Sequence, residues 1–177
     1  VSDCREDTLQ TIRAALTIPN PKFAEAERMG RYAGGIPKTL YYYRLDGERL
    51  VCPRGFSPGL VGIARERGEK CQVVDRTRLL EPVSFRFNGK LRPYQKEACR
   101  AVYDRKTGVL CAPTGSGKTV MAAAMIQARK QPTLVVVHTR ELLYQWADRI
   151  KNFLGVEAGM IGDGKREIGT APIVVEI

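Results

Sequence analysis

The sequence has few of the residues that build metal centres. It contains a single histidine, His138, and five cysteines that are widely spaced and never form a Cys-x-x-Cys pair. Zinc sites need several cysteine or histidine ligands, commonly at such short spacings. We therefore predict reduced thiols and no zinc site.

Long apolar segments are also missing. No hydrophobic run approaches the roughly 20 residues that cross a bilayer, and no signal peptide opens the chain. The sequence predicts a protein without a membrane partner, in a bacterial or phage-like cytoplasm or associated with the nucleoid. Residue 1 is valine and residues 173–177 resemble a buried strand, so we expect a piece of a longer protein, poorly soluble by itself.

Acidic residues are outnumbered by basic ones. The chain carries 29 lysines and arginines against 19 aspartates and glutamates, a formal net charge of +10. Residues 1–90 and 91–177 contribute +5 each, so the excess is not a basic tail. This charge favours a polyanionic partner such as nucleic acid. The alternative, a basic surface with no such partner, stays open because net charge alone is not specific.

What the chain does have is a glycine-rich loop. Residues 112–119 read Ala-Pro-Thr-Gly-Ser-Gly-Lys-Thr, between the apolar run 109–111 and the helix-prone run 120–126. Gly115 and Gly117 allow successive backbone N–H groups to converge on phosphate oxygens. The residues predicted to bind the phosphates of ATP are Thr114, Gly115, Ser116, Gly117, Lys118 and Thr119.

Lys118 and Thr119 have the catalytic roles in this prediction. The Lys118 ammonium reaches the β- and γ-phosphates, and the Thr119 hydroxyl binds the Mg²⁺ that accompanies ATP. The helix that begins here adds its positive N-terminal end. Ala112 stands where the strict phosphate-loop pattern has glycine. The alternative is a glycine-rich turn that binds nothing.

A helix predicted over residues 93–106 carries a further candidate. Pro93 suits its first turn. The Gln95 amide offers both a donor and an acceptor, which can match the N6 and N7 edge of adenine. Gln95 precedes the loop by one helix and one strand, and this placement favours an adenine-binding role.

The order of elements in the second half predicts the fold class. Strands 109–111, 133–138 and 172–177 alternate with helices 118–130 and 140–154. This alternation predicts an α/β domain with a parallel sheet and helices on both faces.

The first half is predicted to be a separate small α+β module. Its expected elements are an ambiguous segment 8–17, a helix 21–29, a hairpin of 39–44 with 48–52, a helix 58–67, and strands 71–75 and 83–87. The candidate nucleic-acid contacts in it are Tyr41, Tyr42, Tyr43, Arg44, Arg54, Arg76 and Arg78. The alternative is that the tyrosines pack the module and the arginines are solvated.

Three motifs occur in order in residues 91–172. They are Leu-Arg-Pro-Tyr-Gln at 91–95, Thr-Gly-Ser-Gly-Lys-Thr at 114–119, and Val-Val-Val-His-Thr-Arg-Glu-Leu-Leu-x-Gln-Trp at 135–146. The succession resembles the first RecA-like domain of superfamily 2 DNA helicases. It is most similar to the branch containing type III restriction translocases, the phage helicase UvsW and the xeroderma pigmentosum group B helicase. The glycine-rich segment 159–165 is also similar to that branch.

The resemblance implies roles for individual residues. Gln95, with Arg92 nearby, resembles the Q motif that contacts adenine, and residues 114–119 resemble motif I. Thr139 and Arg140 resemble motif Ia, which binds the backbone of one nucleic-acid strand. A predicted helix N-terminus carrying Thr139 and Arg140 also suits a phosphate, although Thr139 as a plain N-cap with Arg140 as a surface charge is the alternative. The branch often carries a small DNA-binding domain, similar to a damage-recognition domain, before its motor, which makes residues 1–90 a possible domain of that kind.

Some groups that hydrolysis requires are not identifiable. An acid on Mg²⁺, a group that orients water and an arginine that stabilises transferred charge are needed. In the family, these come from a later motif and from a second RecA-like domain, which we expect in the full-length chain. Glu176 ends an apolar run but is not predicted to be this acid. The piece by itself is therefore predicted to be inactive.

The resemblance implies an ATP-dependent DNA helicase or translocase as the whole protein, with DNA favoured over RNA. Two alternatives stay open. One is a P-loop ATPase of another class, against which Gln95 and the pair Thr139 and Arg140 argue. The other is a non-hydrolysing nucleic-acid-binding module with a vestigial phosphate loop.

Overall fold

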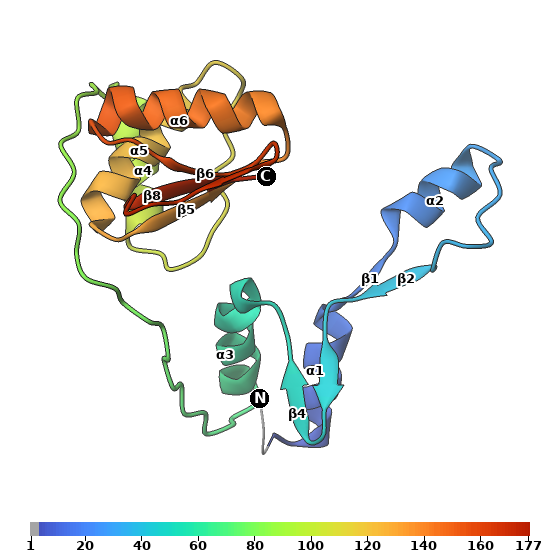
Figure 1. The fold of residues 1–177 in the computed structure, drawn as a ribbon. Helices are drawn as coiled ribbons and strands as arrows, with labels where there is room; N and C mark the ends of the chain where they lie inside the picture. The colour runs from blue at the N-terminus through green and yellow to red at the C-terminus, as the bar shows by residue number, and fades with distance from the viewer. Residues whose placement is uncertain (1–3) are drawn as a thin grey trace. The chain divides into compact units, whose positions relative to one another are not determined.

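A computed structural model describes residues 4–177, which fall into two compact units (Figure 1). Unit 1 ends at Asp75, and unit 2 runs from Arg76 to Ile177. Each unit has its own cluster of buried hydrophobic residues. No helix in the described part of the chain is long and apolar enough to cross a membrane. The division of roles predicted for residues 1–90 and 91–177 stays a prediction.

Unit 1 combines helices with short strands. In chain order its elements are α1 (Glu6–Ala15), β1 (Thr17–Pro19), α2 (Pro21–Arg28), β2 (Thr39–Tyr41), β3 (Arg44–Asp46), β4 (Arg49–Val51), the 3₁₀ turn η1 (Arg54–Phe56) and α3 (Ser57–Glu66). Helix α2 begins as predicted, because the Asn20 side chain accepts a hydrogen bond from the Lys22 N–H and Pro21 holds the first helical position.

The predicted hairpin of unit 1 forms around the Asp46-Gly47 turn, but its first strand is β3 and not the predicted 39–44. β3 pairs antiparallel with β4, with Leu45 opposite Leu50 and Gly47 in the turn at φ 57°. β2 pairs instead with β1, with Thr17 opposite Tyr41. The predicted strand 71–75 is wrong. Those residues are exposed and belong to no helix or strand, since an extended segment without a partner strand makes no ladder.

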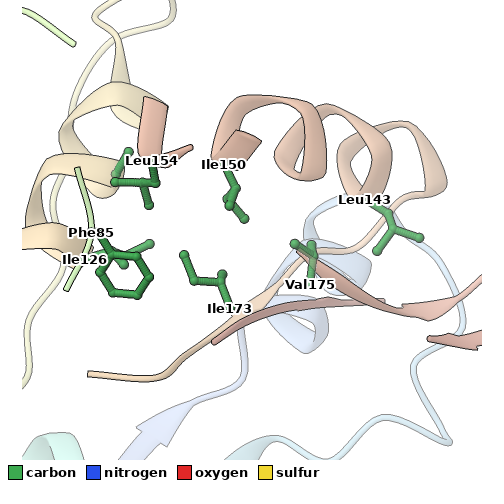
Figure 2. Packing of buried hydrophobic residues seen from close by; sticks show 8 residues of the cluster. Phe85, Ile126, Leu143, Ile150, Leu154, Ile173 and Val175 are labelled. Carbon is green, nitrogen blue, oxygen red and sulfur yellow. The ribbon is translucent and has the colours of Figure 1, made fainter. Parts of the chain in front are cut away.

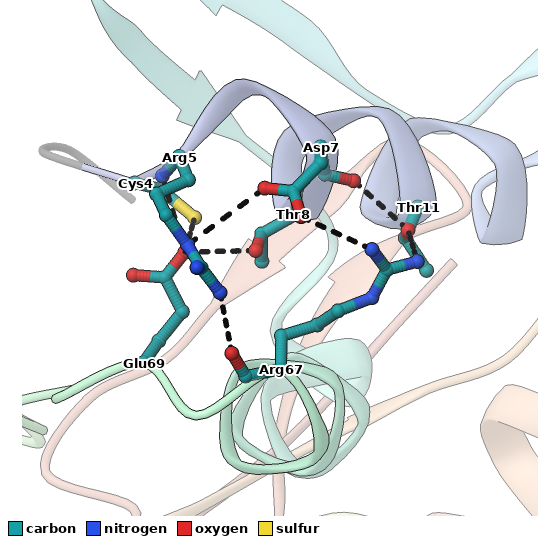
Figure 3. Close-up of polar contacts among 7 residues, drawn as sticks. All are labelled: Cys4, Arg5, Asp7, Thr8, Thr11, Arg67 and Glu69. Carbon is teal, nitrogen blue, oxygen red and sulfur yellow. Dashed lines mark hydrogen bonds and ion pairs between the residues drawn. The ribbon is translucent and has the colours of Figure 1, made fainter.

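Polar contacts join α1 to the chain that follows α3 (Figure 3). Oε1 of Glu69 accepts hydrogen bonds from the Thr8 hydroxyl at 2.7 Å and from the Arg5 backbone N–H at 3.1 Å. Arg67 reaches back to α1, with Nη1 3.2 Å from Oδ2 of Asp7 and Nη2 2.7 Å from Oγ1 of Thr11. The bond from Thr8, and after it those from Arg5, lower the pKa of Glu69 below its ordinary value.

Unit 2 is the α/β domain that the sequence predicts. Its elements are α4 (Pro93–Tyr103), α5 (Lys118–Arg129), β5 (Thr133–Val136), α6 (Arg140–Leu154), β6 (Gly159–Gly162), β7 (Lys165–Glu167) and β8 (Ile173–Glu176). The sheet has the strand order β5-β8-β6-β7. β8 runs parallel to both β5 and β6, as a parallel sheet requires, while β7 pairs antiparallel with β6 and makes the sheet mixed.

The core of unit 2 lies between β8 and its helices. Figure 2 shows Ile173 and Val175 of β8 beside Leu143, Ile150 and Leu154 of α6. Ile173 and Val175 are fully buried because alternate side chains of a strand point to the same face. Ala123 and Ile126 of α5 belong to the same cluster.

The opposite face of this sheet is open in the described residues. Leu134 and Val136 of β5 are 55% and 69% exposed. We predicted helices on both faces, but α5 and α6 contribute to one and the same core. The sheet therefore presents apolar side chains to solvent on its second face.

Two predicted strands of this region are wrong. Residues 109–111 form no strand, and Val109 is almost fully exposed. The described strands leave this segment without a pairing partner, so its β propensity is not enough. Residues 83–87 also form no strand; Phe85 is buried in the core of unit 2, and the Val83 N–H donates to the Lys130 carbonyl at 2.9 Å.

Candidate nucleotide-binding site

The phosphate loop has the backbone that its glycines predict. Gly115 and Gly117 have φ angles of 79° and 82°, in the left-handed region that favours glycine. Gly117 is the N-cap of α5, and Lys118 is the first helical residue. A Cβ atom on Gly117 would lie 2.5 Å from Nε2 of Gln95, so alanine here would be strained by the positive φ and would also displace the Gln95 amide.

Gln95 joins the start of α4 to the loop. The side chain is only 5% exposed. Its Oε1 accepts a hydrogen bond from the Arg92 backbone N–H at 2.8 Å, and its Nε2 donates to the Ser116 carbonyl at 2.8 Å. Both ends of the amide thus have protein partners. The predicted contact of Gln95 with adenine stays a prediction, and the structure adds a second role, that of holding the loop.

Tyr94 makes a contact that the sequence analysis missed. Its hydroxyl donates to the Ser116 carbonyl at 3.0 Å, beside the bond from Gln95. The only sequence signal was its place next to Gln95. Tyr94 and Ala98 of α4, together with loop residues 112–116, line a cavity of about 430 Å³. The cavity lies beside the phosphate loop.

Two polar groups of the loop fit an anionic ligand. The Lys118 ammonium folds over the loop and donates to the carbonyls of Ala112 and Pro113, at 2.9 and 3.0 Å. The Ser116 hydroxyl is buried without a hydrogen-bond partner, which is unusual for a buried polar group. A cation and an unpaired hydroxyl in one glycine-rich loop fit the phosphates of ATP.

The remaining predicted nucleotide ligands are Arg92, Thr114 and Thr119. Arg92 and Thr114 are exposed, and Thr119 is half-buried in the first turn of α5. Residues 4–177 contain no cluster of three or more histidine, cysteine or acidic side chains that could hold a metal ion. The predicted contact of Thr119 with Mg²⁺ stays a prediction.

A second polar group lies at the start of α6. The Thr139 hydroxyl caps this helix, accepting a hydrogen bond from the Leu142 N–H at 3.3 Å. Arg140 forms an ion pair with Asp163, in the turn between β6 and β7. The Tyr144 hydroxyl donates to Oδ2 of the same carboxylate at 2.7 Å. This hydrogen bond to Asp163 raises the pKa of Tyr144.

Sequence reasoning found Thr139 and Arg140 but missed Asp163 and Tyr144. The glycine-rich segment that contains Asp163 was recognised in the sequence, although nothing in it indicated a partner on α6. The bonds found for Thr139 and Arg140 go to Leu142 and Asp163. These contacts do not include Gln95 or the phosphate loop, which contact each other through Gln95 and Ser116.

A sheet with the parallel strands β5, β8 and β6, together with a helix that begins at a glycine-rich loop, is typical of the P-loop class of α/β proteins. The chain belongs to the family described as Type III restriction enzyme, res subunit, whose profile matches residues 88–176. This match confirms the predicted branch of superfamily 2 helicases and translocases.

The sequence is similar to two named proteins whose names fit this family. The chain is 42% identical over 76 residues to the DNA 3'-5' translocase XPB2 of Sulfurisphaera tokodaii, covering 43% of this chain and 17% of that protein. It is 32% identical over 139 residues to the putative helicase 109L of Invertebrate iridescent virus 3, covering 75% of this chain and 42% of that protein. The chain thus spans less than half of the length of these relatives.

A solved structure has the same fold. The crystal structure of T4 UvsW superposes with a TM-score of 0.64 at 21% sequence identity, covering 98% of this chain and 40% of that chain. The predicted fold class, a RecA-like α/β sheet preceded by a small α+β domain, is confirmed.

Proposed function

We propose that this chain is the ATP-binding part of an ATP-dependent DNA helicase or translocase. The observation that carries the proposal is the phosphate loop, in which two left-handed glycines precede α5, Lys118 folds over the loop, and the Ser116 hydroxyl has no partner. The family to which the chain belongs supports this function, and the names of its relatives support DNA as the polymer.

In this proposal, residues 114–119 bind the phosphates of ATP and Lys118 places a positive charge against them. Hydrolysis of bound ATP supplies the free energy for movement on nucleic acid. Gln95 holds the loop because its Nε2 donates to the Ser116 carbonyl and to the Tyr94 hydroxyl, and the second lone pair of its Oε1 accepts a hydrogen bond from the N6 amino group of adenine. Thr119 provides a hydroxyl to Mg²⁺.

The nucleic-acid part of the proposal rests on Thr139 and Arg140. They begin α6, where backbone N–H groups and the positive end of the helix favour a phosphate. The guanidinium of Arg140 is 65% exposed and can donate to a phosphate oxygen. The net charge of +10 supports the same partner, because a basic surface attracts a polyanion before any specific contact forms.

The experiment is a measurement of ATP hydrolysis by the whole protein, with and without single-stranded DNA. We expect DNA to stimulate hydrolysis and Lys118→Ala to reduce the rate by at least about tenfold, because the lysine charge stabilises the transferred phosphoryl group. Lys96→Ala is the matched control, since Lys96 is an exposed lysine on α4 that the site does not use. Its rate should match that of the unmodified protein.

A different outcome would favour the alternative function. If the protein binds DNA but hydrolyses no ATP, and if Lys118→Ala leaves DNA binding unchanged, the loop is not a working nucleotide site. The chain would then be a nucleic-acid-binding module of a helicase-like fold.

A further inference from the structure

The turn between β6 and β7 has an unusual backbone. Gly162, Asp163 and Gly164 are consecutive residues with positive φ angles of 131°, 53° and 73°. Glycine adopts this region freely, whereas other residues meet a steric cost there that aspartate and asparagine tolerate best. Strain of this kind persists where the surrounding contacts determine it. Here the contacts of the Asp163 side chain hold the turn in this conformation.

Each oxygen of the Asp163 carboxylate contacts a residue of α6. Oδ1 pairs with Nη2 of Arg140, and Oδ2 accepts the hydrogen bond from the Tyr144 hydroxyl at 2.7 Å. The Asp163 side chain is only 15% exposed.

Arg140 is in the opposite situation. Its side chain is 65% exposed although it is paired. A guanidinium has five N–H donors in a fixed plane, so one contact to Asp163 leaves donors for a further acceptor. A phosphate can approach Arg140 without displacing Asp163. The ion pair with Asp163 therefore orients the Arg140 guanidinium and leaves it accessible to a phosphate.

A second cation lies on the same turn and faces the same helix. The ammonium of Lys165, in β7, lies 5.8 Å from the centroid of the Tyr144 ring. Arg140 and Tyr144 come from α6, while Asp163 and Lys165 come from the hairpin β6–β7. We call these four residues the α6–hairpin cluster. The cluster places two exposed cations beside the N-terminus of α6.

We propose that the α6–hairpin cluster is one nucleic-acid-backbone contact surface, in which Asp163 is a positioning residue for Arg140 and Lys165 is a second phosphate contact. The inference rests on the proposed nucleic-acid function of Arg140 and extends it to the hairpin. Asp163 fixes the guanidinium before the ligand arrives, which removes part of the side-chain entropy cost of binding.

The direction in which Asp163→Asn changes the affinity for nucleic acid distinguishes a positioning role of Asp163 from a purely electrostatic one. Replacement of Asp163 by asparagine removes a negative charge next to the binding surface. Electrostatics alone would then predict tighter binding to a polyanion. If Asp163 positions Arg140, the same change weakens binding. Asparagine also tolerates the left-handed backbone, so the turn is retained.

The test is binding of a fluorescently labelled single-stranded oligonucleotide to the whole protein, followed by anisotropy at several salt concentrations. We expect Arg140→Ala to weaken binding about tenfold or more, and Asp163→Asn to weaken it about three- to tenfold. Lys165→Ala should reduce the slope of log affinity against log salt by about 0.7, the value for one phosphate of a single strand. Asp148→Asn is the control, because Asp148 is an exposed carboxylate of α6 whose hydrogen bond is to Asn152.

The double variant distinguishes positioning from a general structural effect. If Asp163 acts through Arg140, Asp163→Asn has no further weakening effect once Arg140 is alanine. An equal weakening in both backgrounds would mean that Asp163 only maintains the fold, and the inference would be overturned. Unchanged or tighter binding by Asp163→Asn, with Arg140→Ala still weak, would overturn it as well. If the unmodified protein binds no oligonucleotide, the proposed function itself fails.

Discussion

Nε2 of Gln95 donates a hydrogen bond to the carbonyl oxygen of Ser116 at 2.8 Å, which joins α4 to the phosphate loop over 21 residues of sequence. The same amide accepts the Arg92 N–H at the start of α4. A single side chain thus fixes the beginning of one helix and the loop before another. A change at Gln95 must affect both.

We predict that Gln95→Ala lowers the free energy of unfolding by about 1–2 kcal/mol, since it leaves buried backbone groups without one of their partners. The Ser116 carbonyl keeps the bond from Tyr94, which limits the loss. Urea denaturation followed by circular dichroism measures the change. Tyr94→Phe, which removes the other donor, should cost less because Tyr94 is more exposed.

The same variant distinguishes the two roles of Gln95. Binding of ATP and of inorganic tripolyphosphate is measured by calorimetry for Gln95→Ala and for the unmodified protein. If Gln95 holds the loop, both ligands bind more weakly. A loss for ATP alone would mean that Gln95 acts only through adenine.

Gly117 and Gly115 provide a matched pair of substitutions. Alanine at either position is strained by the positive φ, by about 1–2 kcal/mol. Only at Gly117 would the new Cβ also approach Gln95, since nothing lies within 4 Å of a Cβ at Gly115. We therefore expect Gly117→Ala to be the more destabilising change in a thermal unfolding experiment. Adding Gln95→Ala should recover part of the difference, and equal losses at the two glycines would contradict the close approach seen here.

Acid is predicted to weaken unit 1 through Glu69. The hydrogen bond from Thr8, followed by those from Arg5, lowers the pKa of this carboxyl in the folded state. A lowered folded pKa contributes stability above the unfolded value, and this contribution is lost as the pH falls through the folded pKa. We expect Glu69→Gln to be less stable than the unmodified protein at neutral pH. The difference in melting temperature should shrink as the pH falls below about 4.5, the ordinary pKa of glutamate. A difference that stays constant down to acid pH would exclude this linkage.

The core of unit 2 gives a prediction with an internal control. Ile150 is almost fully buried beneath α6, whereas Leu134 on the outer face of the sheet is 55% exposed. Ile150→Ala should lower the free energy of unfolding by about 2–5 kcal/mol, because it removes buried methylene groups and leaves a cavity. Leu134→Ala should change it by less than about 1 kcal/mol in this chain. Chemical denaturation of both variants checks the contrast.

The elements predicted correctly are those with local signals. α5 begins at Gly117 and Lys118, α6 begins at the Thr139 cap, and α6 ends before Gly155 in the left-handed region. Capping residues act on neighbours three or four positions away, so the sequence contains the information. The strand β8 was predictable from its apolar run.

The strands that were predicted wrongly depend on distant partners. The run 109–111 has the composition of a strand, but no described strand lies beside it. Phe85 was predicted in a strand of the first module and instead belongs to the core around Ile126 and Ile173. Burial and pairing decide β structure, and neither can be inferred from composition alone.

In the candidate site, too, residues in a local sequence pattern could be predicted, whereas residues that depend on distant contacts could not. Residues 114–119 could be singled out because the phosphate-binding pattern is contiguous, and Gln95 because it precedes that loop by one helix; their contacts with ATP stay predictions. Asp163 was not found, since its relation to Arg140 and Tyr144 arises from a left-handed turn that brings a carboxylate from a hairpin onto a helix. The contact of Asp163 with α6 depends on the tertiary structure, so the local sequence does not predict it.

The open face of the sheet, with Leu134 and Val136 exposed, changes how dye fluorescence from this chain should be interpreted. Dyes such as anilinonaphthalene sulfonate emit when they bind apolar surface, and strong emission is commonly taken as a sign of loose packing. Here the folded chain already offers such a surface on a sheet whose other side is fully packed. Bright emission at low temperature, together with a sharp melting transition by circular dichroism, is therefore the signature of the native fold.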